Sequence, residues 1–241
     1  MKILIVHLDY LINNFVATSV IKGLYKKIED PKITWTTYDD NKYIFEYNKN
    51  INKVINKEEM KNDDTNYDIL INFTPVFDHK YFKDIKFEHS LGFNFVRENG
   101  KYFNNIYGNN TTNKNIFQIY YKLAGLSWEG EGYDVNYFPR NKTKKNRIGI
   151  SVAHANLRNY VNDNLKLDTK KLYHVPYKKN YFKRMDELNK CQKIITDDLT
   201  TFHLAMALRK YVYFLQILPL NTKLELFGKG EIHQVPKNIV Q

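Results

Sequence analysis

The sequence predicts an α/β protein made of two Rossmann-like domains, and three observations support this fold class. Short apolar runs with strand character alternate with stretches of helical spacing through Gly125. A charged segment with few apolar residues, YFPRNKTKKNR at 137–147, then interrupts the pattern. The alternation restarts at residue 148. The predicted domains are therefore 1–140 and 148–241, with a linker around the interruption.

In the first domain, the predicted strands are apolar or β-branched runs, and they lie at 2–6, 32–38, 53–55, 67–73 and 89–95. Apolar residues at helical spacing predict helices at 14–28 and 116–124, with Gly125 as the C-cap of the second helix. Pro31 ends the first of them. A short helix or turn is expected at 44–52.

The second domain repeats the same alternation. Its predicted strands lie at 148–152, 171–176, 193–196, 211–215 and 223–227. Its predicted helices lie at 181–191 and 201–210, and Thr200 or Thr201 is the expected N-cap of the second helix.

The charge of the chain limits its partners. Lysine and arginine outnumber aspartate and glutamate by 37 to 26, which gives a net charge of +11. Such a surface favours nucleic acid, an acidic membrane or phosphorylated small molecules. An arginine-rich arm and an RNP motif are absent from the sequence, so nucleic acid is the least favoured of the three. A lysine-rich surface that is merely solvated remains the alternative.

The single cysteine and the amino terminus bear on the compartment. Cys191 cannot form a disulfide within the chain, fits a reducing environment and is expected to be a packing thiol. The first apolar run has five residues before His7 and Asp9 interrupt it, so it does not resemble a signal peptide. We therefore expect a cytoplasmic protein.

The segment KIITDDLTTFHLAMALRK, at 193–210, is the most informative for chemistry. A buried strand ends in Asp197 and Asp198, and a helix follows after a tight turn. A helix N-terminus offers free N–H groups to an anion, and His203 falls in the first turn of this helix. The alternative is that Asp198 only caps the helix and His203 only packs. The spacing of these acids and the histidine matches no metal site, so no metal is predicted.

The same segment carries a family resemblance. TDDLTTFHLAMAL resembles the Asn-Asp-Ser-Gly-x-x-His-Leu-Ala-x-Ala-Leu element of the ADP-heptose:lipopolysaccharide heptosyltransferase family, glycosyltransferase family 9. The amino-terminal 37 residues, the strand YDILINF, the turn LGF and the segment IGISVAHANLRNY are similar to the other blocks of that family, in the same order. The resemblance implies two Rossmann-like domains that face a cleft, the GT-B type, with a reduced carboxyl-terminal domain.

The resemblance also implies a reaction. It is a metal-independent, inverting transfer of a heptose or hexose from a nucleotide-diphospho-sugar to a saccharide hydroxyl, in lipopolysaccharide biosynthesis. No cofactor is implied beyond the donor itself, which is a co-substrate. Because such an acceptor is carried by a membrane, the resemblance also implies peripheral contact of the protein with the inner face of an anionic membrane. The first domain is then the acceptor side and the second holds the donor. The donor-binding residues carried over are Arg158, Asp198, Thr200, Thr201 and His203.

The turn after the first strand departs from the family pattern. Where the family has Leu-Gly-Asp, with the acid as general base, this chain has Leu11, Ile12 and Asn13. An amide cannot accept the proton of a hydroxyl at neutral pH. Asn13 therefore stands at the catalytic position, and Asp9, Asp78 or His79 is a substitute base. The alternative is a catalytically impaired binding subunit that works with a partner subunit.

Overall fold

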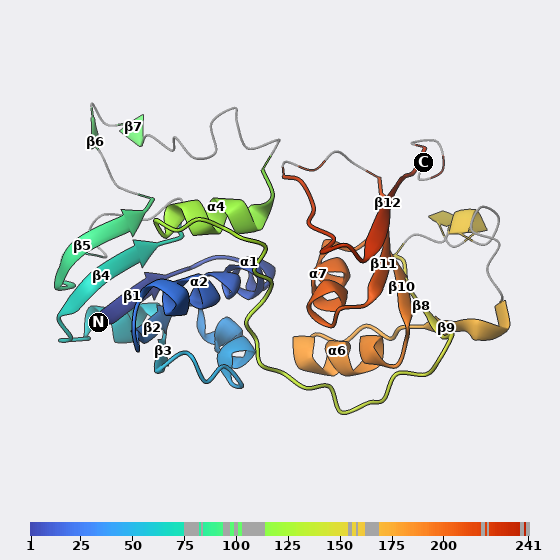
Figure 1. Ribbon diagram of the computed structural model, residues 1–241, viewed down its shortest axis with the longest axis horizontal. Helices are drawn as coiled ribbons and strands as arrows, with labels where there is room; N and C mark the ends of the chain where they lie inside the picture. The colour runs from blue at the N-terminus through green and yellow to red at the C-terminus, as the bar shows by residue number, and fades with distance from the viewer. Residues whose placement is uncertain are drawn as a thin grey trace. The chain divides into compact units, whose positions relative to one another are not determined.

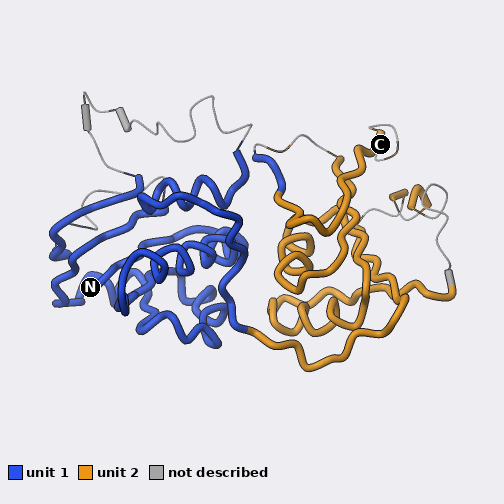
Figure 2. Tube along the Cα trace, viewed as in Figure 1, with its two compact units in different colours: residues 1–136, 221–224 blue, residues 137–220, 225–241 orange. Residues whose placement is uncertain are grey.

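A computed structural model of the chain describes residues 1–74, 82, 84–93, 97–98, 101–102, 114–153, 156–157, 159–161, 169–217, 220, 222–236 and 239. The chain forms two compact units, which Figure 2 distinguishes by colour. Unit 1 comprises Met1–Asn136 and Asn221–Leu224, and unit 2 comprises Tyr137–Leu220 and Glu225–Gln241. In the part of the chain that the structure describes, no helix has the length and apolar character needed to cross a membrane.

Unit 1 is built on a parallel five-stranded sheet with the order β3-β2-β1-β4-β5. The strands are β1 (Lys2–Val6), β2 (Lys32–Thr36), β3 (Lys53–Ile55), β4 (Tyr67–Asn72) and β5 (Phe87–Gly92). Two short strands, β6 (Arg97–Glu98) and β7 (Lys101–Tyr102), pair separately and antiparallel. A central β1 that is buried along nearly its whole length explains the continuous apolar run KILIV.

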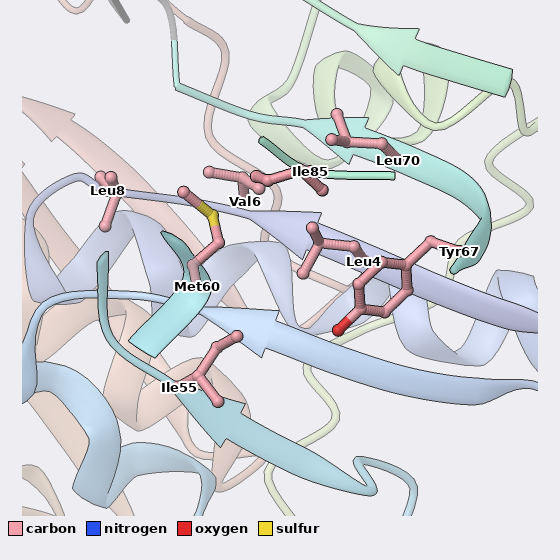
Figure 3. Close-up of a cluster of buried hydrophobic side chains, with 8 residues drawn as sticks. All are labelled: Leu4, Val6, Leu8, Ile55, Met60, Tyr67, Leu70 and Ile85. Carbon is pink, nitrogen blue, oxygen red and sulfur yellow. The ribbon is translucent and has the colours of Figure 1, made fainter. Parts of the chain in front are cut away.

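Helices cover both faces of this sheet (Figure 1). They are α1 (Leu11–Ala17), α2 (Ser19–Lys27), α3 (Lys57–Lys61), α4 (Ile116–Leu123) and the 3₁₀ helix η1 (Asp39–Phe45). Side chains alternate between the faces of a strand, so Leu4 and Val6 pack with Met60 of α3 (Figure 3). On the other face, His7 meets Tyr120 of α4 and Trp35 meets Asn14 of α1.

Unit 2 contains a second parallel five-stranded sheet, with the order β12-β11-β10-β8-β9. The strands are β8 (Ile148–Ser151), β9 (Leu172–His174), β10 (Lys193–Thr196), β11 (Tyr211–Gln216) and β12 (Gly230–Gln234). One face carries an apolar cluster that includes Ile150 and Ile195. The described helices α6 (Tyr181–Asn189) and α7 (Leu199–Ala207) pack against each other, and α7 also packs on β10 and β11. A further 3₁₀ turn, η3, spans Thr169–Lys171.

The fold class predicted from the sequence is confirmed, and three details of the prediction are wrong. The first helix is divided at Thr18 into α1 and α2, because the Thr18 hydroxyl bonds back to the carbonyl of Phe15. The last strand is β12, whereas the predicted strand at 223–227 is irregular because Lys223 pairs with Asn115 in unit 1. The N-cap of α7 is Asp198, which has two backbone N–H partners.

The segment predicted as a linker is fastened to unit 2. It has no helix or strand, as its composition indicates, but its polar groups bond to the end of α6. Asp186 accepts hydrogen bonds from the Tyr137 hydroxyl and the Arg140 N–H, at 2.8 and 2.7 Å. Lys210 secures the same segment by donating to the Thr143 hydroxyl at 2.8 Å. The polar residues of this segment, which suggested an exposed linker, therefore hold it to unit 2.

Candidate functional site

Each sheet has a point at which its strand order reverses. In unit 1 this point lies between β1 and β4, and in unit 2 it lies between β8 and β10. Loops that leave neighbouring strands there in opposite directions open a crevice at the carboxyl ends of the strands, where α/β proteins bind ligands. Both motifs singled out in the sequence, the turn after β1 and the turn after β10, lie at these two points.

A pocket of about 570 Å³ lies at the reversal point of unit 2. It is formed where β8, β9 and β10 end, together with the first turns of α6 and α7. Its lining residues are Ile150, Ser151, Val152, Ala153, His174, Val175, Tyr177, Tyr181, Arg184, Asp198 and Thr200. The size suits part of a nucleotide-sized ligand.

Arg184 is the central cation of this pocket. Its Nη2 donates to Oδ2 of Asp198 at 2.8 Å and also to the Thr201 hydroxyl. The side chain of Arg184 is 7% exposed, whereas that of Asp198 is 37% exposed. Buried Nε of Arg184 has no hydrogen-bond partner among the described residues. A guanidinium in the wall of a pocket can bind an anion there through its N–H groups.

Sequence reasoning missed Arg184, although the sequence holds a signal for it. Tyr181, Arg184, Met185 and Leu188 share the spacing i, i+3, i+4, i+7, which defines one face of a helix. All four are buried in α6. An arginine in the apolar stripe of an amphipathic helix needs an interior partner, and that requirement points to a functional or structural ion pair.

Asp198 holds the first turn of α7. Its carboxylate accepts from the N–H groups of Thr200 and Thr201, at 3.3 and 2.9 Å, and from the Thr201 hydroxyl at 2.6 Å. The structure therefore brings Asp198, Thr200 and Thr201 together, and Asp198 and Thr200 line the pocket. Because Asp198 already occupies two N–H groups of the helix, Arg184 is a better anion contact than the helix terminus itself.

His203 lies in the core of unit 2. It is 3% exposed, stacks edge-on against Phe202 at a centroid distance of 5.1 Å and is not among the residues that line the pocket. Burial lowers the pKa of His203 to about 3, so the ring is neutral at physiological pH. A neutral ring packed in the core agrees with the alternative that His203 only packs. Its role as a donor contact stays a prediction.

In unit 1, Asp9 is the half-buried acid at the reversal point. Its Oδ2 accepts from the Asn13 amide at 2.8 Å, and its Oδ1 accepts from the N–H of Tyr10 at 2.6 Å. Burial alone would raise the pKa of Asp9, but the interactions with His7, with the Tyr10 N–H and with Asn13 outweigh it and lower that pKa. Asp9 is therefore a carboxylate at neutral pH.

Four other residues were named from the sequence. Asp78, His79 and Arg158 lie outside the described residues, so their roles stay predictions. Cys191 is fully buried, and burial raises the pKa of its thiol to about 11, in agreement with a packing role.

Comparison with known proteins supports the fold. No protein-family model and no curated protein matches the sequence. Among solved structures, E. coli heptosyltransferase WaaC with ADP-2-deoxy-2-fluoro heptose is 13% identical, with a TM-score of 0.64 over 99% of this chain and 94% of that one. E. coli ADP-heptose lps heptosyltransferase II is 11% identical, with a TM-score of 0.64 over 98% and 91% of the two chains. A glycosyl transferase family 9 structure from Veillonella parvula is 12% identical, with a TM-score of 0.62 over 97% and 86%. The chain thus has the two-domain α/β fold, of GT-B type, that these heptosyltransferase and family 9 structures share.

Proposed function

We propose that the protein is a glycosyltransferase that uses a nucleotide-diphospho-sugar as donor and bears its donor site in unit 2. The observation that carries the proposal is the pocket at the β8–β10 reversal point, with buried Arg184 in its wall. A structure with the same fold is described as holding ADP-2-deoxy-2-fluoro heptose, and another as holding ADP. The net charge of +11 also favours anionic ligands.

The pocket residues supply the chemistry that such a donor needs. When the sugar leaves, negative charge grows on the diphosphate, and a fixed cation in a pocket sheltered from water stabilises it. Arg184 is that cation in our proposal, and Arg158 adds a second. Asp198 holds the guanidinium and the first turn of α7 in place, and its remaining exposure lets it meet a donor hydroxyl. The reaction needs no metal and inverts the sugar configuration.

The acceptor in this proposal is a hydroxyl of a cell-surface saccharide such as lipopolysaccharide, and heptose or hexose is the transferred sugar. One solved relative in fold is described as an lps heptosyltransferase, which motivates the choice. Peripheral contact with an anionic membrane goes with this acceptor.

Nucleotide-dependent turnover tests the proposal. Purified protein is incubated with ADP-, UDP- and GDP-sugars, and the released nucleoside diphosphate is measured for wild type and Asp198→Ala. We expect one nucleotide class to be bound and turned over by wild type, and the variant to bind it at least ten times more weakly. Absence of both binding and turnover with every donor would refute the proposal.

A further inference from the structure

Three asparagine side chains around the turn after β1 donate hydrogen bonds to Asp9. Asn13 donates to the side chain of Asp9, and Asn14 donates to its backbone carbonyl at 3.1 Å. A third amide, Asn41 of η1, donates to the same carbonyl at 2.9 Å. Asparagines from two elements thus fix both the backbone and the carboxylate of Asp9.

Asn14 is itself held by the sheet. It is fully buried, and its Oδ1 accepts from Trp35 Nε1 and from the Thr37 hydroxyl, each at 3.1 Å. Every polar atom of the Asn14 side chain is therefore used, which makes it a rigid support. Burying a polar side chain such as Asn14 costs free energy of folding. Buried, fully hydrogen-bonded residues of this kind are typical of positions that hold a functional side chain in place.

The carboxylate of Asp9 remains available to a ligand. Its side chain is 22% exposed, and the two hydrogen bonds to its oxygens leave further lone pairs free to accept a proton. Next to it, Tyr10 is 80% exposed and offers an aromatic face on which a sugar ring can lie. The exposed aromatic ring and the oriented carboxylate together suit a saccharide, whose ring would stack on Tyr10 and whose hydroxyl would meet Asp9.

We propose that Asp9 accepts the proton of the acceptor hydroxyl, and that Asn13 and Asn14 are positioning residues for it. This inference rests on the proposed function. The acceptor oxygen forms a bond to the anomeric carbon of the donor sugar, and the bond from that carbon to the diphosphate oxygen breaks. The electron pair leaves with the nucleoside diphosphate, and the hydroxyl proton passes to Oδ2 or Oδ1 of Asp9.

The electrostatic surroundings agree with this role. Among the described residues, the titratable group against Asp9 is His7, whose Nε2 lies 3.8 Å from Oδ2. Burial lowers the pKa of His7, so the ring is neutral, and the hydrogen bonds that α1 and η1 donate to Asp9 come from the amides of Asn13, Asn14 and Asn41. The lowered pKa of Asp9 keeps the carboxylate ionised at neutral pH, which is the protonation state that can accept a proton.

The test measures release of nucleoside diphosphate from ADP-glucose, UDP-glucose and GDP-mannose, with water in place of the saccharide. Asp9→Asn should lower kcat by about 100- to 10,000-fold while nucleotide affinity stays within about twofold of wild type. Asp64→Asn, which changes an exposed acid elsewhere in unit 1, is the matched control and should leave kcat unchanged.

Asn13 variants separate positioning from a structural role. Asn13→Ala removes a hydrogen bond that lowers the pKa of Asp9, so the acid limb of the kcat profile should move to higher pH. Asn13→Asp should not raise kcat above wild type, because the new carboxylate would lie against that of Asp9. A rise in kcat for Asn13→Asp, or an unmoved acid limb for Asn13→Ala, would overturn the assignment.

The outcomes for the two proposals differ. If wild type binds and turns over a donor but Asp9→Asn keeps its kcat, the inference about Asp9 fails and the donor pocket stands. If wild type binds a donor without any turnover, the inference fails in favour of a binding subunit that needs a partner. If wild type binds no donor at all, both proposals fail. Thermal unfolding of each variant shows that the fold is kept.

Discussion

The guanidinium of Arg184 donates to the carboxylate of Asp198 at 2.8 Å, and this pair joins α6 to the first turn of α7. One partner is almost fully buried and the other is more than one-third exposed. Asp198 is therefore the partner open to solvent, whereas Arg184 is held in the interior of unit 2. It links the stability of unit 2 to the geometry of the candidate donor site.

Two substitutions of Asp198 should differ in stability. Asparagine also caps helices well, so Asp198→Asn loses the ion pair and keeps the cap, whereas Asp198→Ala loses both. We expect Asp198→Asn to reduce the free energy of unfolding by about 1–3 kcal/mol, a value limited by the exposure of the carboxylate. Alanine should cost about 0.5–2 kcal/mol more. Urea unfolding measures both, and equal stability of the two variants would contradict the cap.

The buried ring of His203 should make stability depend on pH. Its pKa is about 3 in the folded protein and about 6.5 when unfolded, so between these values only the unfolded chain binds the proton. The free energy of unfolding should therefore fall by about 1.4 kcal/mol per pH unit as the pH drops below 6.5. His203→Leu should remove this share of the slope, and His89→Asn, at an exposed position, should not. Urea unfolding at pH 5 and 7 makes the comparison.

Gly92 should not tolerate a side chain. Its φ is +94°, and an added Cβ would clash with the backbone of Asn72 in β4. Gly130 has nearly the same φ, +96°, but no atom within 4 Å of an added Cβ, so Gly130→Ala controls for backbone strain alone. We expect Gly92→Ala to be at least 2 kcal/mol less stable than Gly130→Ala, roughly the cost of overpacking a core. Similar losses in both variants would contradict the close approach of β4 and β5.

The thiol of Cys191 should be unreactive in the native protein. It is fully buried, and its raised pKa of about 11 leaves almost no thiolate at neutral pH. Ellman's reagent should label it only after denaturation. Labelling of one thiol within seconds under native conditions would show that the connection between α6 and β10, where Cys191 lies, is open to solvent.

The sequence was sufficient for most of the architecture because its signals are local. Strands β3 and β10 match their predicted bounds to the residue, since short apolar runs between turn signals leave little freedom. The tight turn after β10 was predicted for the same reason, because the bonds from Thr200 and Thr201 to Asp198 are within three residues, although the predicted N-cap was wrong.

Contacts between elements that are distant in the sequence could not be predicted from it. Arg184 meets Thr201 across 17 residues, and only the packing of α6 on α7 brings them together. The apolar residues around Lys223 predicted a strand, yet Lys223 pairs with Asn115, more than 100 residues earlier and in the same unit. The bond from Asn13 to Asp9 spans four residues, but the preceding turn had to be known before the two side chains could be paired.

The most direct test of the donor pocket compares two neighbours on α6. Arg184 is buried in the pocket wall and Lys183 is exposed, so Arg184→Met and Lys183→Met each remove one positive charge from the same helix turn. ADP, UDP and GDP are titrated into wild type and both variants by calorimetry. The account predicts that one nucleotide binds wild type and Lys183→Met with similar affinity, and binds Arg184→Met at least ten times more weakly. Equal affinity for all three proteins, or no binding by wild type, would contradict it.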